Sequence, residues 1–520
     1  MNHHPSPAAP QGQRGAFPNH VGGSAILRPM NGFNHTSGLR VLSCLLLVTG
    51  LLLGCASGPK DAAAPGAALS EEDATKREQR LAIKAVAEQI QSGEMDNEVG
   101  RETLKRYAWR RAAPNDIRIA AIDALIENDP QDTARMLALM LPTETDWEVI
   151  GSICELAADG GWQNMAPALV RSWSRPVLEP ADPDRPERAA LIALFPDQSV
   201  ETTVYDVFAS PPDDRFFGER ARMDAWALLQ RIDEDGSQTK ALLAENPSQT
   251  PTDALHGALL DGAQELQITP RTTDQLMWLQ SLRQPERRGY WDEVTEVVAS
   301  LNTSQLEGFE IRHLEPIRWA AANEPSWLAS SREDLLDRLE TELDGRKRSQ
   351  RTDGYVDFTG DSQETLNTWR DRLCWGDVLV LLIGARVVED DELAVDFFEQ
   401  AIRDQSDRST EYGGVIDSQG DEFVAVLYPP RPAQRLGDQR FVASAELIEA
   451  SHTALFHYHF HAQRNRNAAF AGPGRGDLEY AEQLGRSCLV LTLVSANELN
   501  VDCYLPTGAR IDLGGVSRPR

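Results

Sequence analysis

Amphipathic helices that follow one another in pairs constrain the fold of this chain more than any other feature. Across residues 71–372, apolar residues recur at the spacing of one helix face. In one such helix these residues are Ile117, Ala121, Ala124 and Leu125. Pro, Asn and Asp at 114–116 and 128–130 mark where this helix begins and ends. Helices of about ten to fourteen residues that pair and repeat roughly every 30 to 40 residues are typical of an α-solenoid, a stack of helix pairs.

The repeating phrases also resemble a known family. Residues 116–125 (DIRIAAIDAL) are similar to a HEAT repeat. The repetition becomes irregular after Pro176, where Pro and Asp interrupt the helices at 180–186 and 211–214. An irregular helical domain without true repeats is therefore the alternative interpretation. In both cases we expect residues 71–375 to form a scaffold that binds a protein or peptide partner and carries no catalytic group.

The N-terminal residues have the features of an export signal. Residues 1–60 contain no Asp or Glu, and Arg40 precedes a fourteen-residue apolar run at 41–54 (VLSCLLLVTGLLLG). This run is shorter than a membrane span, which needs about 20 residues, and it fits the apolar core of a signal peptide behind a basic flank. We therefore expect residues 1–54 to be a signal peptide, and a start at Met30 would give it a more usual length.

The end of this run resembles the lipobox of bacterial lipoprotein signals. It reads Leu52-Leu53-Gly54-Cys55, and the resemblance implies cleavage before Cys55 and a lipid on its thiol. Residues 55–70 are rich in Ala, Gly and Pro, which is typical of a flexible tether. The expected product is an exported lipoprotein, held by its acyl chains at the outer membrane or the periplasmic face. A short transmembrane anchor is the alternative.

Charge and cysteine content exclude some partners and some kinds of fold. The chain has 80 acidic and 51 basic residues and a net charge of −29 at pH 7, so we expect no nucleic-acid partner. Apart from Cys55, the chain after the signal has only four cysteines, too few to staple a body of this size. Two of them, Cys488 and Cys503, would face each other across a hairpin that turns at 495–496, either as a disulfide or as packed thiols.

Residues 376–520 predict a small α/β domain. A tract rich in turn residues at 346–360 closes the helical part, and the periodicity changes beyond Glu389. Helices are expected at 391–403 and 477–485, among short runs rich in β-branched and aromatic residues. The expected strands are 413–416, 422–427, 454–461, 488–494, 499–504 and 510–513.

Histidines are concentrated in one of these strands. Four of the six histidines from Cys55 onward lie within ten residues, and His457, His459 and His461 alternate along the strand. Alternate residues of a strand point to one face, so these imidazoles converge. Asp477 begins the following helix. Two imidazoles and one carboxylate, with a fourth position open to water, suit a catalytic Zn²⁺; a histidine-rich strand with Asp477 as a helix cap is the alternative.

The order of these residues resembles the JAMM/MPN+ zinc metalloproteases, which include deubiquitinating enzymes. In that family a Glu-x-x-Gly strand follows a first helix, His-x-His lies on a later strand, and Asp-Leu opens the next helix. The similar residues here are Glu411 (in EYGGVI), His459-Phe460-His461 and Asp477-Leu478, so the resemblance covers about residues 390–515. It implies that His459, His461 and Asp477 bind zinc, and that Glu411 is the general base of amide or isopeptide hydrolysis. His457 with His459 is the rival ligand pair; His459 with His461 is preferred because it keeps the loop to Asp477 shorter.

Two features depart from the family pattern. Fifteen residues separate His461 from Asp477, which makes a longer loop than the family has. The family's Ser, three positions before the Asp, is Gly474 here, and that Ser helps to stabilise the oxyanion. Two functions therefore stay open: a zinc-dependent peptidase or amidase, and a non-catalytic interaction scaffold with a structural MPN-type domain.

Overall fold

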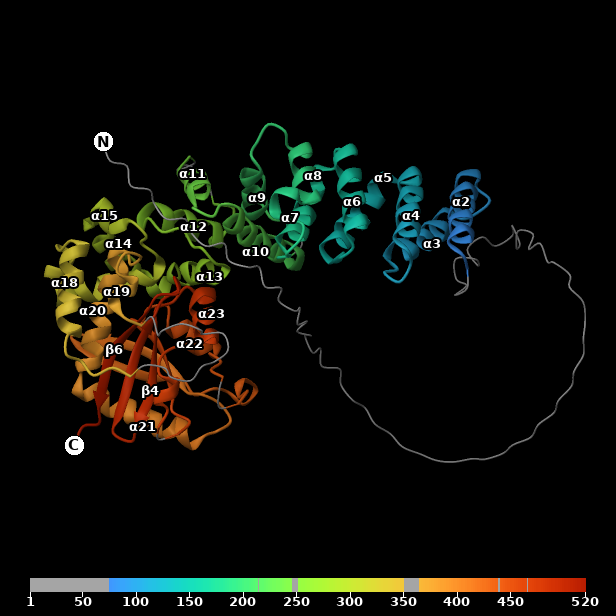
Figure 1. Cartoon of the computed structure of the whole chain (residues 1–520). Helices are drawn as coiled ribbons and strands as arrows, with labels where there is room; N and C mark the ends of the chain where they lie inside the picture. The colour runs from blue at the N-terminus through green and yellow to red at the C-terminus, as the bar shows by residue number, and fades with distance from the viewer. Residues whose placement is uncertain (1–73, 214, 246–250, 350–363, 438–439, 465) are drawn as a thin grey trace, which may run out of the picture. The chain divides into compact units, whose positions relative to one another are not determined.

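The computed structural model describes residues 74–213, 215–245, 251–349, 364–437, 440–464 and 466–520 (Figure 1). The expected signal peptide (1–54, or from Met30), the lipidation site Cys55 and the tether at 55–70 lie outside these residues. None of the described helices is both long and apolar enough to cross a membrane.

Helices make up the described chain as far as residue 343, as the sequence predicts. They are α2 (Lys76–Ser92), α3 (Asn97–Trp109), α4 (Asn115–Asn128), α5 (Pro130–Met140), α6 (Trp147–Asp159), α7 (Ala166–Ser174), α8 (Pro186–Leu194), α9 (Val200–Ala209), α10 (Arg215–Ile232), α11 (Ser237–Glu245), α12 (Ala254–Glu265), α13 (Thr273–Leu282), α14 (Arg288–Ser300), α15 (Thr303–Leu306), α16 (Leu314–Asn323), α17 (Pro325–Leu328) and α18 (Arg332–Leu343).

Helix α4 shows how the local sequence sets these boundaries. Its buried residues include Ile117, Ala121 and Leu125, the positions that share one face. The helix ends before Asp129, whose side chain accepts a hydrogen bond from the Asp132 N–H and so caps α5. The predicted start and end of this helix are therefore confirmed.

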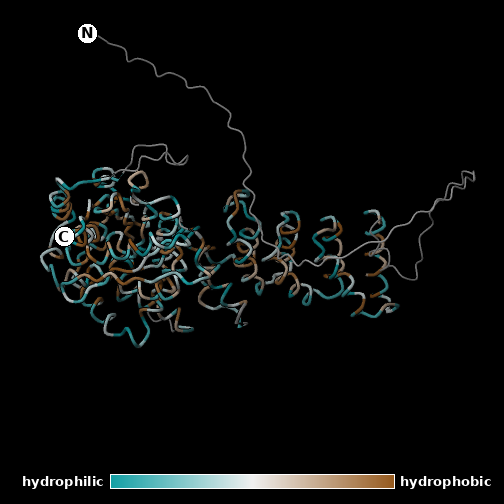
Figure 2. Tube along the Cα trace, turned by 90° about the horizontal axis from the view of Figure 1, so that it is seen from below, coloured by the Kyte–Doolittle hydropathy of each residue, from teal (hydrophilic) through white to brown (hydrophobic). Residues whose placement is uncertain are grey.

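Contacts between the first helices follow a regular order. Helix α2 packs against α4, α4 against α6 and α6 against α8, while α5 packs against α7 and α7 against α9. Hydrophobic and hydrophilic residues alternate along these helices (Figure 2), as expected when one face of each helix is buried. Helices stacked two apart are the contact pattern of repeated helix pairs. The finer assignment to an α-solenoid of HEAT-like repeats stays a prediction.

The α/β part contains six strands in one sheet, and all six expected strands are confirmed. They are β1 (Gly413–Gln419), β2 (Glu422–Leu427), β3 (Phe456–His461), β4 (Cys488–Ser495), β5 (Glu498–Tyr504) and β6 (Arg510–Ser517). The order is β2-β1-β3-β4-β5-β6, and only β3 and β4 are parallel neighbours. Helix α23 (Arg475–Leu484) joins these two strands, because a parallel connection needs a crossover.

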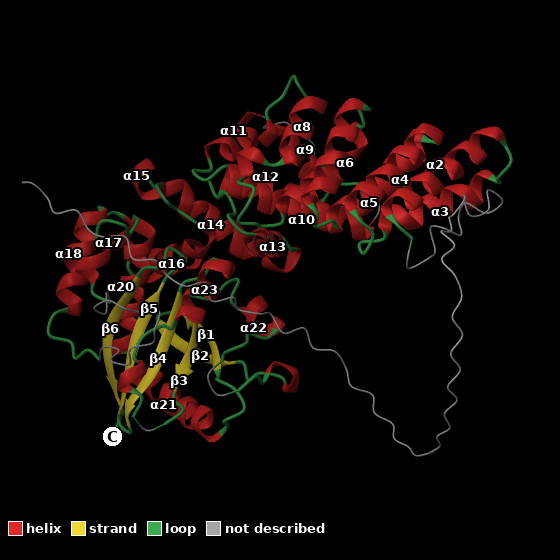
Figure 3. Cartoon of the chain, turned by 45° about the vertical axis from the view of Figure 1, so that its right-hand side comes forward, coloured by secondary structure: helices red, strands yellow, loops and turns green. Residues whose placement is uncertain are grey.

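Four further helices accompany the sheet (Figure 1 and Figure 3). They are α19 (Leu366–Trp369), α20 (Trp375–Glu389), α21 (Asp391–Ser406) and α22 (Ala445–Ala450). Helix α20 contacts β5 and β6, and α21 contacts β2. The sequence predicts α21 and α23, but α22 was not expected.

The hydrophobic core does not divide where the secondary structure changes. One core extends from Ala82 to Leu276 and a second from Leu266 to Val516. The second core includes helices α13 to α18 together with the sheet. The domain boundary proposed between residues 375 and 376 stays a prediction, but the sheet and the helices before it share one interior.

The structure corrects the disulfide option for Cys488 and Cys503. Cys488 lies opposite Tyr504 in the β4–β5 ladder, and Cys503 lies opposite Leu489. Neighbouring residues of a strand point to opposite faces of the sheet, so the two thiols are on different faces. Both cysteines are free and buried.

A buried ion pair joins two helix pairs of the helical part. Arg118 on α4 pairs with Glu144, and each side chain is 2% exposed. Arg118 also donates to the Ala108 carbonyl, while Glu144 accepts from the N–H groups of Thr145 and Asp146. Burial alone would raise the pKa of Glu144, but the guanidinium and these N–H groups outweigh it and lower the pKa.

Removal of Arg118 should therefore strongly destabilise the protein. We expect Arg118→Ala to lower the free energy of unfolding by about 3–5 kcal/mol, because Glu144 is left as an unpaired buried charge. Urea denaturation of the purified protein measures this change. Arg135→Ala is the matched control, since Arg135 is 71% exposed; its effect should stay within about 0.5 kcal/mol. Equal stability of the two variants would contradict the role of the buried pair.

Candidate metal centre

Strand β3 places three histidines on one face of the sheet. His457, His459 and His461 are buried, because β3 lies between β1 and β4. The ladder sets His459 opposite Gly413 of β1 on one side and Val490 of β4 on the other. The rings therefore point to the face that α23 approaches.

Two of these imidazoles and one carboxylate meet at a single point. The Nε2 atoms of His459 and His461 are 3.4 Å apart. Asp477 Oδ1 is 3.3 Å from His459 Nε2, and Asp477 Oδ2 is 3.6 Å from His461 Nε2. Two ligand atoms, each about 2.1 Å from one tetrahedral ion, lie about 3.4 Å apart. The three separations thus fit ligands of one ion.

Glu411 joins the same group from another element. Its carboxylate and the ring nitrogens of His459 and His461 lie within 4.8 Å of one another, and all three residues are buried. Glu411 comes two residues before β1, and Gln463 Nε2 donates to its Oε1 at 2.8 Å. The four residues proposed from the sequence as ligands and base are therefore brought together, and the group can hold a metal ion.

Asp477 lies in the first turn of α23, where it has two roles at once. The Gly474 N–H donates to Asp477 Oδ2 at 2.6 Å, which caps the helix. The other side of the carboxylate faces the imidazoles. The cap role named as the alternative is thus present, and it does not compete with metal binding.

The second ring nitrogens have partners that orient the imidazoles. His461 Nδ1 lies 3.4 Å from the Phe470 carbonyl oxygen. A carbonyl only accepts, so Nδ1 carries the hydrogen and the lone pair of neutral His461 is on Nε2. His459 Nδ1 lies 3.3 Å from the Tyr504 hydroxyl. Such outer partners are what fixes the rings of metal-binding histidines.

Electrostatics keep the carboxylate of Asp477 ionised. Burial alone would raise its pKa, but attraction to His459 and His461 in their charged forms, together with hydrogen bonds from His459 and the Gly474 N–H, outweighs burial. The pKa of Asp477 therefore lies well below its usual range. An ionised carboxylate beside two imidazoles is the donor set that a borderline divalent cation such as Zn²⁺ prefers.

His457 belongs to a different environment. Its Nδ1 lies 2.7 Å from the Tyr480 hydroxyl, and its ring meets Phe441 edge to face. Burial lowers the pKa of His457 well below the ordinary value, with His459 and Arg486 adding to the effect, so the ring is neutral. Of the two ligand pairs considered, the nitrogens of His459 and His461 are those that reach Asp477.

Sequence reasoning missed the residues that support the group. Gln463 lies two residues beyond the end of β3, so strand alternation does not place it, and its hydrogen bond to Glu411 depends on the path of the segment after the strand. Tyr504 carries no local signal either, because its approach to His459 depends on the pairing of three strands. Phe441, whose ring stacks on His459 with centroids 5.5 Å apart, comes from the segment between β2 and α22.

A second cluster of metal-ligand types, His313, Cys374 and Asp377, has a structural explanation. His313 Nδ1 accepts from the Glu310 N–H at 3.0 Å, so the hydrogen is on Nε2, which donates to Asp377 at 3.2 Å. Asp377 also pairs with Arg312 at 2.6 Å. A guanidinium at the carboxylate opposes a cation, so we assign no metal to this cluster.

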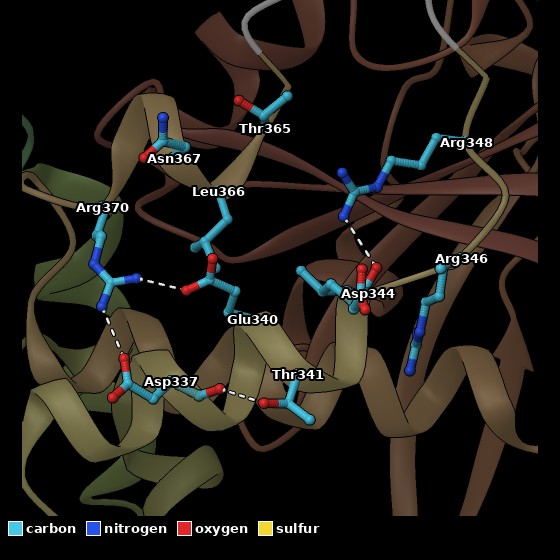
Figure 4. Close-up of a pocket in the computed structure, with 12 residues that line it drawn as sticks. Asp337, Glu340, Thr341, Asp344, Arg346, Arg348, Thr365, Leu366, Asn367 and Arg370 are labelled. Atoms are coloured by element: carbon cyan, nitrogen blue, oxygen red, sulfur yellow. Dashed lines mark hydrogen bonds and ion pairs between the residues drawn. The ribbon is translucent and has the colours of Figure 1, made fainter.

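A pocket of about 680 Å³ lies at helix α18, and no histidine is among the residues that line it (Figure 4). Part of its charged lining is already paired: Arg370 binds Asp337 at 2.9 Å and Glu340 at 3.0 Å. Two other lining residues, Arg348 and Thr365, flank residues 350–363, which lie outside the described chain. We assign no ligand to this pocket.

Comparison with known proteins adds no relative: no family model, no curated protein and no solved structure matches this chain.

The geometry predicts which histidines bind metal. Purified wild-type protein should retain about one zinc ion per chain after dialysis, and His461→Ala should lose it, because a two-ligand site holds zinc weakly. His457→Ala is the matched control, since it removes a buried imidazole from the same strand; it should keep the metal. Elemental analysis gives the zinc content of each. Loss of zinc in His457→Ala and retention in His461→Ala would identify the rival ligand pair instead.

Proposed function

We propose that the C-terminal α/β domain is a JAMM-like zinc hydrolase that cleaves amide or isopeptide bonds. One observation carries the proposal: His459, His461 and Asp477 converge with the separations expected of ligands, and Glu411 lies in the same group. The order of elements supports it, because Glu411 precedes a strand paired with the His-x-His strand, and Asp477 opens the helix that follows.

The four residues would have two different roles, metal binding and proton transfer. His459, His461 and Asp477 would hold the ion through two nitrogens and one oxygen. Zinc in such a site polarises a carbonyl and lowers the pKa of a coordinated water to about 7. Glu411 would accept the proton of that water and deliver it to the leaving amine. The hydrogen bond from Gln463 fixes one oxygen of Glu411 and so orients the carboxylate for this transfer.

Stabilisation of the oxyanion must come from groups other than the family's Ser, because Gly474 has no side chain. The Gly474 N–H is engaged by Asp477, and the Arg475 side chain is 68% exposed and paired with Glu479 at 2.8 Å. The first N–H groups of α23 have no acceptor within the helix. They are therefore the donors that we propose for the oxyanion.

The rest of the chain would place this domain at a membrane. We propose a lipid on Cys55, after removal of residues 1–54, and a tether at 55–70 that leads to the helical part. The HEAT-like scaffold at 71–375 would bind a protein or peptide partner. The stacked helix contacts of α2 to α9 support this assignment, because solenoids present extended binding surfaces.

The second candidate function is a non-catalytic scaffold with a structural MPN-type domain. Gly474 in place of Ser is the observation that favours it. Zinc content does not distinguish the two functions, because a structural zinc site would also retain the ion. Only the hydrolase would turn over a substrate.

The proposed roles predict different losses in two variants. Glu411→Gln should keep zinc but lower peptidase activity by about 10²–10⁴-fold, because an amide cannot accept the proton. His461→Ala should lose both zinc and activity. Zinc content and hydrolysis of a fluorogenic peptide panel are measured on the same samples. Zinc in the wild type with no hydrolysis of any peptide would favour the scaffold; absence of zinc would exclude the metal site.

The anchor is tested separately. Cys55→Ser should leave an unprocessed precursor and release the protein from the membrane fraction, because the acyl chains can no longer be attached. Intact mass spectrometry of the wild type should show the lipid on an N-terminal cysteine. A variant that stays in the membrane, together with a wild type without acyl mass, would contradict the lipoprotein assignment.

A further inference from the structure

The loop between two candidate ligands is positively charged, whereas the chain as a whole has a net negative charge. Residues 462–476 connect His461 to Asp477 and contain three arginines, with no acidic residue and no lysine. In the whole chain, acidic residues outnumber basic ones by 80 to 51. The loop therefore differs in charge from the average of the chain.

A second segment with more arginines than acidic residues contacts the proposed metal-binding group. Residues 428–441 contain three arginines and one acid. The segment contacts the residues that precede Glu411, because the Gly437 N–H donates to the Ser409 carbonyl at 2.9 Å. At its other end, the Phe441 ring stacks on His459. Both segments thus meet the group that we propose to hold zinc.

Three arginines of these two segments are paired with acids: Arg431 with Glu446, Arg435 with Asp407 and Arg475 with Glu479. The other three, together with Arg408, which precedes Glu411 by three positions, are not. Arg408, Arg440, Arg464 and Arg466 are exposed, and none of them forms an ion pair with another described residue. These four residues, the arginine border, lie within five positions of Glu411, Phe441 or His461 in the sequence.

We propose that the substrate is an acidic peptide whose carboxylates bind the arginine border while its amide enters the site. This inference rests on the proposed hydrolase function and names its substrate class. A guanidinium binds a carboxylate through two parallel hydrogen bonds. A positive border also attracts an acidic peptide over a distance and raises its rate of association.

The test compares peptides that differ only in charge. Three fluorescent peptides of equal length carry Glu, Gln or Lys on both sides of the same amide bond. Binding is measured by anisotropy with zinc-loaded Glu411→Gln, which should not turn over, and hydrolysis is measured with the wild type. The Glu peptide should bind at least about tenfold more tightly than the Gln peptide at low salt, and added salt should reduce the difference.

Charge-reversal variants identify the arginines that cause the preference for the Glu peptide. Arg464→Glu with Arg466→Glu should remove the preference for the Glu peptide and retain zinc, which shows that the site is intact. Arg77→Glu with Arg110→Glu makes the same charge change at exposed arginines of α2 and the end of α3, and it should preserve the preference. Equal binding of all three peptides, preference for Lys, or a preference that survives Arg464→Glu with Arg466→Glu would each overturn the inference. Selective binding without any hydrolysis would instead contradict the proposed hydrolase and leave the acidic-peptide site standing.

Discussion

Burial of helix α20 is the constraint on which the α/β part depends. Thirteen of its fifteen residues are buried, because α16 and α18 cover one side and the sheet covers the other. A helix that is apolar all round has to be enclosed on all sides. Gly384 shows how close this contact is: a Cβ there would lie 2.8 Å from Leu513 Cδ1 on β6. The sheet that presents the histidines is thus built on the helices before it.

A polar contact connects the same helices to the strand of histidines. Trp278 on α13 donates to the His452 carbonyl at 2.8 Å, and His452 lies four residues before β3 begins. The Arg486 guanidinium lies over the Trp278 ring, 4.1 Å from its centroid, and Arg486 donates to the Ser451 carbonyl at 2.9 Å. The start of β3 is therefore held by α13, so the helical part helps to position the candidate metal centre.

The sequence predicts much of the site because its signals are local. Alternation places His457, His459 and His461 on one face whatever the strand pairs with, and Asp477 follows a Gly-rich turn that begins a helix. The partners across strands are not local signals. A shift of one residue in the β4–β5 ladder would bring Cys503 to the face of Cys488 and would remove Tyr504 from His459. Pairing register cannot be obtained from periodicity alone, and these are the features that the sequence left open.

The hydrogen bonds of the group argue for a shared cation. His461 directs its Nε2 lone pair at the position that Asp477 and His459 also face, and its Nδ1 hydrogen is held by the Phe470 carbonyl. Lone pairs and carboxylate oxygens that converge in a buried place repel one another unless a positive species lies between them. A proton on His459 Nε2 can form a hydrogen bond to one or two of these acceptors, whereas a divalent ion can be coordinated by all of them at once. The geometry of the group therefore fits a metal ion better than it fits a protonated histidine beside a helix cap.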